Sequence, residues 1–141
     1  MITQEEYKEL NLLCGNMIGA AIEVHKELGP GLLESAYEAC MISELKSKGL
    51  NVKSQISLPL IYKGIETGKT YRLDMLVEDK VIVELKAIEE IKTLHEIQLV
   101  TYLKLTGKKI GLLINFNTPI LKAGIKRKIN GKIEYTGIKS V

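Results

Sequence analysis

The chain has 141 residues, of which 45% are hydrophobic and 26% are charged, and Lys and Arg exceed Asp and Glu by 20 to 17. This length suits one domain of ordinary size, and this composition excludes a disordered or low-complexity chain. We therefore expect a single domain over residues 1–141, with a core large enough to be stable.

The sequence carries no signal for export or membrane insertion. No charged and apolar leader opens it, and no apolar run approaches the roughly 20 residues that span a bilayer. The two cysteines, Cys14 and Cys40, are too few for a disulfide-stapled secreted domain. We expect a soluble, cytoplasmic protein without a membrane partner.

Charge is unevenly distributed along the chain. Residues 1–70 hold 7 basic and 9 acidic side chains, whereas residues 71–141 hold 13 basic and 8 acidic ones. The basic stretch at 122–128 follows a phosphate backbone in one interpretation and is a solvated strand end in the other. The excess is compatible with a polyanionic partner and does not demonstrate one.

Two helices are predicted in the first third of the chain. Apolar residues recur at steps of three and four over residues 5–28, which indicates one helix with an apolar face. Gly29-Pro30-Gly31 interrupts it, and Pro30 is tolerated in a first helical turn. The second helix is expected at about 32–48, ending at Gly49.

After Gly49 the pattern changes to strands. Residues 52–62 are rich in β-branched and large apolar side chains, and Pro59 among them favours an edge position or a bulge. A polar, glycine-containing turn is expected at 63–69. Two further strands, 71–77 and 81–88, then flank Glu78-Asp79-Lys80 as a hairpin.

The remainder of the chain completes an α/β pattern. Thr93 to Glu96 has the form of a capping box, which predicts a third helix that ends near Gly107. A continuous apolar run at 110–116 indicates a strand buried on both faces, and shorter strands are expected at 120–129 and 133–135. This order predicts an α/β fold, a mixed central β-sheet flanked by α-helices.

The hairpin carries the most informative charged residues. Side chains alternate across a strand, so Glu84 and Lys86 project from one face of 81–86, whose other face is apolar. If Val77 pairs with Val81, counting outward places Asp74 opposite Glu84, with Cβ atoms roughly 5 Å apart. Two carboxylates this close repel unless a proton, a nearby cation or a divalent metal compensates them.

Magnesium suits such a pair, because it prefers oxygen ligands and keeps positions for water and substrate phosphate. Lys86 would then orient or deprotonate an attacking water or steady developing charge, as metal-assisted phosphodiester cleavage requires. An ordinary cross-strand arrangement, with Lys86 paired to a carboxylate on a solvated face, explains the same residues. The residues alone leave both interpretations open.

Five other side chains are candidates for a functional role. Gln98 and Tyr102 lie four residues apart on one helix face, either as ligand contacts or with Tyr102 in the core and Gln98 at its rim. Glu34 lies in a first helical turn, where the dipole favours a carboxylate without a catalytic role. Either histidine is a candidate base or ligand. His95 shares the face of Gln98, whereas His25 lies near a helix end, where a histidine more often binds terminal carbonyls.

These residues resemble a known pattern. The spacing Asp74-x9-Glu84-x-Lys86 is similar to that of the PD-(D/E)xK nuclease superfamily, with Leu73 where the superfamily name has proline. Gln98-x3-Tyr102 resembles the extra motif of its exonuclease-like branch.

A second motif resembles a narrower group. Gly31-Leu-Leu-Glu34-Ser-Ala-Tyr37 reproduces the motif that names the GxxExxY protein family. The segments at 71–74, 83–86, 95–104 and 111–116 also resemble that family, so the likeness extends from about residue 25 to residue 127.

The resemblance implies a restriction-endonuclease-like core whose acidic residues meet at the edge of the sheet. It implies six site residues: the metal ligands Asp74, Glu84 and Glu34, the catalytic lysine Lys86, and Gln98 and Tyr102, which position water or substrate. The implied function is phosphodiester hydrolysis by a nuclease with Mg²⁺ or Mn²⁺, on DNA in preference to RNA.

A second class of function stays open. The chain would then be a non-catalytic nucleic-acid-binding or assembly module that kept the nuclease fold. An enzyme for small phosphate esters lacks support, because the sequence has no G-x-x-x-x-G-K loop. A homodimer is compatible with either class and suits a nuclease that cuts two strands.

Overall fold

The computed structural model describes residues 1–134. Its elements in chain order are β1 (Ile2–Thr3), α1 (Gln4–Leu28), α2 (Glu34–Ser47), β2 (Val52–Tyr62), β3 (Ile65–Val77), β4 (Val81–Lys86), α3 (Thr93–Thr106), β5 (Ile110–Asn115), the 3₁₀ turn η1 (Leu121–Gly124), β6 (Ile125–Ile129) and β7 (Ile133–Glu134). No helix in this part of the chain is long and apolar enough to cross a membrane.

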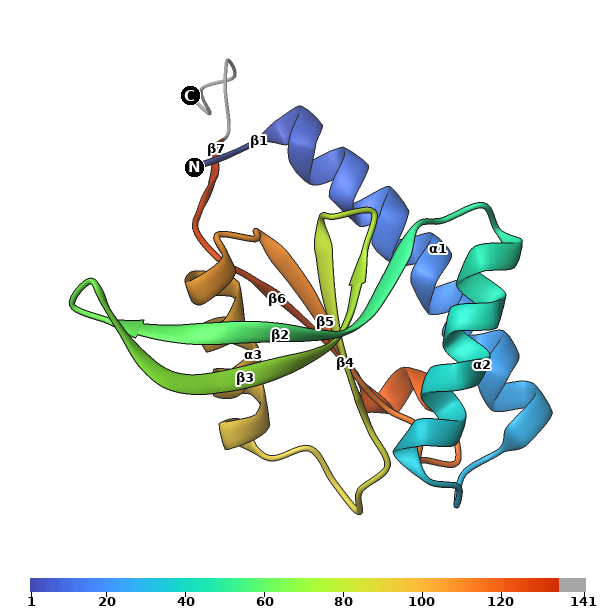
Figure 1. Ribbon diagram of the computed structural model, residues 1–141. Coiled ribbons are helices and arrows are strands. Elements are labelled where there is room, and N and C mark those ends of the chain that lie inside the picture. The colour runs from blue at the N-terminus through green and yellow to red at the C-terminus, as the bar shows by residue number, and fades with distance from the viewer. Residues whose placement is uncertain (135–141) are drawn as a thin grey trace.

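The main sheet has five strands in the order β2-β3-β4-β5-β6. Strands β4 and β5 run parallel and the other neighbours antiparallel, so the sheet is mixed. Helices α1 and α2 pack on one face and α3 on the other (Figure 1). The predicted α/β class, with a mixed sheet flanked by helices, is confirmed. The short parallel pair β1–β7 was not expected.

Each face of the sheet has its own hydrophobic cluster. Val81, Val83 and Leu85 of β4 pack with α1 and α2 on one side. Ile82 packs with α3 on the other side, which confirms the alternation expected for this strand. Every residue of β5 is buried, as predicted for a strand covered on both faces. Gly111 permits this cover, because a Cβ there would lie 2.8 Å from Leu99 of α3.

Strands β2 and β3 form an arm that extends beyond the rest of the sheet (Figure 1). Only Met75–Val77 of β3 pair with β4, whereas the other paired residues of the strand pair with β2 alone. The register of β2 shifts between Pro59 and Ile61, which confirms both the edge position and the irregularity expected from proline.

The long polar turn predicted at 63–69 is wrong. The chain reverses at Lys63 and Gly64, whose φ angles of 50° and 79° are left-handed, and β3 already begins at Ile65. A two-residue turn of this kind matches the twist of paired strands, so the polar residues after it stay in the ladder. Residues 65–72 are all exposed, so the polar composition of this part of the arm resembled a loop.

The second helix begins later than predicted. Pro30 lies before α2, and the Tyr37 hydroxyl explains why. It donates a hydrogen bond to the Gly29 carbonyl at 2.6 Å and accepts one from the Leu32 amide at 3.1 Å. The segment is thereby held as a loop, and α2 begins at Glu34.

The third helix ends at Thr106 with Gly107 as its C-cap, close to the predicted end, but its expected capping box at Thr93 is wrong. Lys92 is the N-cap, and its amide donates to Nδ1 of His95 at 2.9 Å. The His95 ring thus takes the part expected of Glu96, which instead pairs with Lys128 of β6 at 2.6 Å.

Two strand boundaries also differ from the prediction. Strand β4 stops at Lys86, because the Asn115 side chain bonds both the amide and the carbonyl of Ile88. The strand expected at 120–129 begins as the 3₁₀ turn η1 and becomes β6 only at Ile125. In the strand expected at 133–135, Ile133 and Glu134 form β7, and Tyr135 lies outside the described residues.

Candidate active site

At the predicted position, the side-chain carboxylates of Asp74 and Glu84 take the place of backbone hydrogen bonds between β3 and β4. Val77 pairs with Val81 and Met75 with Val83, as the hairpin count required. At the next position, the Asp74 amide donates to Oε2 of Glu84 at 2.8 Å. The Leu85 amide in turn donates to Oδ2 of Asp74 at 2.8 Å. Each acid therefore binds the backbone of the other's strand, and the two side chains are close.

The alternation of side chains along β3 breaks at Asp74. Met75 belongs to the cluster under α1 and α2, whereas Leu73, two residues earlier, belongs to the cluster under α3. Gln55 of β2, midway between the partners of these two residues, has a left-handed φ of 50°. This local irregularity lets Asp74 face α2, although a regular strand would turn it toward α3.

Glu84 is a buried carboxyl, with only 6% of its surface exposed. Burial, and then the charge of Asp74, raise its pKa from 4.5 to about 8, and Glu34 adds to the increase. The Asp74 amide and the Lys86 ammonium oppose that shift. In the absence of a further cation, the raised pKa favours the protonated form of Glu84. This is the compensation by a proton that the close pair of acids requires.

The Asp74 side chain lines a small acidic pocket on the α2 side. The pocket measures about 140 Å³ and is lined by Glu34, Ser35, Glu38, Gln55, Asp74 and Leu85. The Gln55 amide donates to Oε1 of Glu38 at 2.6 Å, which ties the left-handed residue of β2 to α2. Glu38 and Gln55 were not singled out from the sequence. Glu38 follows Glu34 by one helical turn, and this spacing could have placed both carboxylates on the same helix face from the sequence alone.

Lys86 lies at a larger opening on the α3 side, which we call the apolar groove. It measures about 630 Å³, and its walls include Tyr71, Lys86, Ile97, Gln98, Tyr102 and Leu105. The backbone of Lys86 is fixed, because its carbonyl accepts a bond from the Phe116 amide at 2.9 Å. Lys86, Gln98 and Tyr102 line the same groove, and the four-residue spacing had placed Gln98 and Tyr102 on one helix face.

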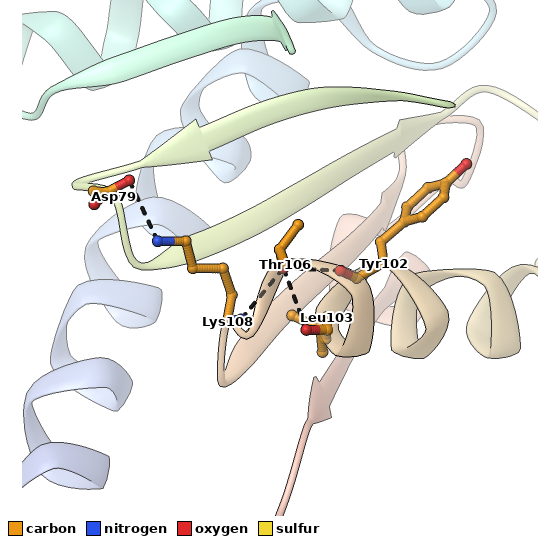
Figure 2. Close-up of polar contacts among 5 residues, drawn as sticks. All are labelled: Asp79, Tyr102, Leu103, Thr106 and Lys108. Atoms are coloured by element: carbon orange, nitrogen blue, oxygen red, sulfur yellow. Dashed lines mark hydrogen bonds and ion pairs between the residues drawn. The ribbon is translucent and has the colours of Figure 1, made fainter. Parts of the chain in front are cut away.

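Tyr102 satisfies both interpretations of its position. Its side chain is 6% exposed and packs in the core cluster under α3, yet it also lines the groove. Burial and the nearby charge of Glu84 raise its pKa. Figure 2 shows Tyr102 pointing away from the end of α3, where Thr106 donates to the Tyr102 carbonyl at 2.8 Å. The ring is thereby anchored at a fixed turn of the helix.

The histidines and the basic stretch have structural partners. His25 Nε2 lies 2.8 Å from the Thr118 carbonyl, so this ring binds a loop rather than the end of its own helix. His95 lines the apolar groove while its Nδ1 caps α3. Within 122–128, Arg127 donates to Asn11 at 2.5 Å and Lys128 pairs with Glu96.

The predicted site residues therefore fall into two groups joined by Glu84. Asp74 and Glu34 line the acidic pocket, and Lys86, Gln98 and Tyr102 line the apolar groove. Within residues 1–134, no three His, Cys, Asp or Glu side chains are close enough to hold a metal ion together. The oxygens of Asp74 and Glu84 still fit Mg²⁺, because this ion takes as few as one or two carboxylates and keeps several waters.

Comparison with known proteins agrees with this arrangement. A model of the PD-(D/E)XK nuclease superfamily matches residues 11–128.

The chain belongs to the PD-(D/E)XK nuclease superfamily. No curated protein and no solved structure matches the chain. Membership supports a nuclease-type function in general terms, with a nucleic-acid substrate, and members of this superfamily generally use divalent metals.

Proposed function

We propose that this chain is a divalent-metal-dependent nuclease that hydrolyses phosphodiester bonds, with DNA preferred over RNA. The observation that carries the proposal is the pair of carboxylates, Asp74 and Glu84, each bonded to the backbone of the other's strand at 2.8 Å. Lys86 follows on the same strand, and its charge acts on Glu84. Superfamily membership supports the same conclusion.

Asp74 and Glu84 would hold Mg²⁺ or Mn²⁺, since carboxylate oxygens are the ligands that these ions prefer. A bound ion would supply Lewis-acid stabilisation of the charge that develops on the phosphate oxygens. Glu34 lines the pocket of Asp74, and we assign it to the metal site as a residue that would hold the ion through a water molecule.

Lys86 is assigned to the reacting phosphate. Its ammonium group orients the attacking water and steadies the negative charge as the new P–O bond forms and the ester P–O bond breaks. The attacking water gives up a proton to solvent, and the departing alkoxide takes one up from solvent. Gln98 and Tyr102 share the groove of Lys86, and their amide and hydroxyl groups donate hydrogen bonds to the substrate backbone.

The GxxExxY resemblance supports this assignment, because the glycine and the tyrosine of the motif position its glutamate, Glu34. Gly31 has a φ of 102°, which a side chain would strain, and the Tyr37 hydroxyl binds both ends of the same loop. Together they determine where α2 starts and hence where Glu34 meets the acidic pocket.

Cleavage assays on single-stranded and duplex DNA and RNA, with Mg²⁺ or Mn²⁺, test the proposal. Lys86→Ala is expected to lose about 100-fold or more of the rate, the usual effect of removing a group that acts in the transition state. Lys53→Ala, at an exposed lysine of β2, is the matched control and keeps full activity. Equal rates for the Lys86→Ala variant and wild type, or no cleavage with any metal, would overturn the proposal.

A non-catalytic nucleic-acid-binding or assembly module is the second candidate. It is favoured by the lack of a group of three metal-binding side chains within residues 1–134. Titration with Mn²⁺ separates the two candidates. A nuclease binds the ion with an affinity that falls in Asp74→Asn, whereas a binding module shows no affinity that depends on Asp74.

A further inference from the structure

The apolar groove beside Lys86 is too large and too exposed to be explained by the hydrolytic step alone. Tyr71 is 42% exposed, Ile97 54% and Leu105 42%, although all three line the same opening. Large apolar side chains gathered in one solvent-exposed groove indicate a binding surface. The groove lies between the arm of β2 and β3 and the outer face of α3.

Charge distinguishes this groove from the rest of the site. Within residues 1–134, no acidic side chain lines it, and its wall contains Lys86 and His95. The neighbouring pocket has three acids, Glu34, Glu38 and Asp74. An occupant of the groove is therefore mostly apolar in its body, with negative charge where it approaches Lys86.

Tyr71 presents an aromatic surface in this groove. Its ring centre lies 6.0 Å from that of Tyr102 at an interplanar angle of 53°, so the rings are tilted and not stacked. Tyr71 is also three residues before Asp74 on the same strand. A ring stacked on Tyr71 is thus held close to the two carboxylates.

We infer that the apolar groove binds an unpaired nucleobase stacked on Tyr71, so that the substrate is single-stranded nucleic acid or an unpaired end. This inference rests on the proposed function and names its substrate class. A nucleobase has an apolar face, and the phosphate that follows it is the anion that Lys86 requires. In a duplex, base stacking hides those faces, and such a groove would stay empty.

Binding to a fluorescent oligothymidylate, measured by anisotropy with EDTA present, tests the inference without cleavage. Wild type is expected to bind the single strand more tightly than a blunt duplex of equal length. Tyr71→Ala should weaken single-strand binding about 5- to 150-fold, the range measured for loss of one stacked base. Tyr71→Phe keeps the ring and should stay within about twofold.

Two further controls make the outcomes decisive. Tyr7→Ala, on α1 and away from the groove, should bind as wild type does, and thermal melting should show that all variants fold. Equal affinity for single strand and duplex, unchanged binding in a folded Tyr71→Ala, or equal losses in Tyr71→Phe and Tyr71→Ala would overturn the inference. So would a dimer that Leu105→Glu dissociates, because a second copy would then cover the groove.

Failure of this inference is distinguishable from failure of the nuclease proposal. Metal-dependent duplex cleavage that Tyr71→Ala leaves intact retains the nuclease and overturns the groove assignment. Tyr71-dependent binding of single strands without cleavage under any metal retains the groove assignment and overturns the catalytic role of Lys86.

Discussion

The two openings beside strands β3 and β4 differ in almost every physical respect. The acidic pocket on the α2 side is small, about 140 Å³, and contains three carboxylates. The apolar groove on the α3 side is about 630 Å³ and has exposed apolar walls with Lys86. A cation suits the first opening, and a nucleobase with its phosphate suits the second.

Glu84 lies between these two regions and is influenced by both. The charges of Asp74 and Glu34 raise its pKa, and that of Lys86 lowers it. Glu84 in turn raises the pKa of Tyr102 on the groove side. Under the proposals above, one side would hold the cation and the other the strand, and Glu84 would couple the two.

Removing the negative charge of Asp74 should have the largest effect on this division. Asp74→Asn keeps an oxygen that can accept the Leu85 amide bond, so the fold is expected to persist. It removes the charge of one proposed metal ligand, and we expect at least about a 100-fold loss of cleavage, as for other groups that stabilise charge in the transition state. Calorimetric titration with Mn²⁺ should show weakened binding alongside that loss.

Leu105→Ala provides the opposite control for this experiment. It alters only the groove and should leave Mn²⁺ affinity unchanged. If Asp74→Asn bound Mn²⁺ as wild type does, the acidic pocket would not be the cation site. The assignment of different ligands to the two openings would then be wrong.

Glu84→Gln should change how stability depends on pH. The folded pKa of Glu84 is raised from 4.5 to about 8, so between these values the folded protein holds a proton that the unfolded chain has lost. This contribution to stability is complete below about pH 4.5 and is lost as pH rises toward 8, at up to about 1.4 kcal/mol per pH unit. Glutamine cannot ionise, so the variant should gain stability relative to wild type across this window.

Urea unfolding in EDTA between pH 5 and 9 measures this difference. Glu89→Gln, at an exposed glutamate in the loop before α3, is the matched control and should follow the wild-type curve. Parallel curves for wild type and Glu84→Gln would show that the buried carboxyl is already ionised at neutral pH. Added Mg²⁺ should narrow the gap by compensating the acids in wild type.

The hairpin was predictable because local rules determine it. Alternation along β4 and the short loop between Val77 and Val81 set the register, which placed Asp74 beside Glu84. The facing of Asp74 toward α2 was not predictable. It depends on the left-handed backbone of Gln55 in a neighbouring strand, and no residue near Asp74 in the sequence predicts that irregularity.

The other missed features also depend on contacts distant in sequence. Tyr37 delays α2 by bonding the preceding loop, and His95 caps α3 one residue earlier than Thr93 would. The groove residue Tyr71 was expected in a strand, but its role needs α3 to lie across from it. Spacing located the charged groups, whereas only tertiary structure separated the acidic pocket from the groove.

Tyr37→Phe should affect the acidic pocket selectively. The variant keeps the ring that stacks on Phe116 at 4.4 Å but loses the hydroxyl that bonds Gly29 and Leu32. We expect a loss of about 1–3 kcal/mol in the free energy of unfolding, because partly buried backbone groups lose their partner. Urea unfolding measures this loss, with Tyr62→Phe on the exposed arm as the control.

The separation of the acidic pocket from the apolar groove is supported if Tyr37→Phe weakens Mn²⁺ binding and leaves oligothymidylate binding unchanged. The loop that Tyr37 holds leads directly into Glu34, and its loosening should displace that carboxylate. Equal weakening of both ligands would show that α2 supports the groove as well, which contradicts the division described above.

A substitution at the opposite end of β4 should have almost no effect on stability or function. There, Lys108 pairs with Asp79 at 3.4 Å, and Figure 2 shows this contact joining the β3–β4 turn to the segment after α3. The Asp79 side chain is 71% exposed, so the pair should contribute less than about 1 kcal/mol. Asp79 has a left-handed φ of 56°, which asparagine also tolerates, so Asp79→Asn isolates the charge.

We therefore expect Asp79→Asn to change the free energy of unfolding by less than about 1 kcal/mol, with the difference shrinking at high salt. Cleavage, Mn²⁺ binding and oligothymidylate binding should all match wild type, since the turn lies at the far end of β4 from Lys86. A loss in any of the three at unchanged stability would mean that the hairpin transmits strain along β4. In that case the acidic pocket and the groove would belong to one mechanically coupled strand pair rather than to two separable regions.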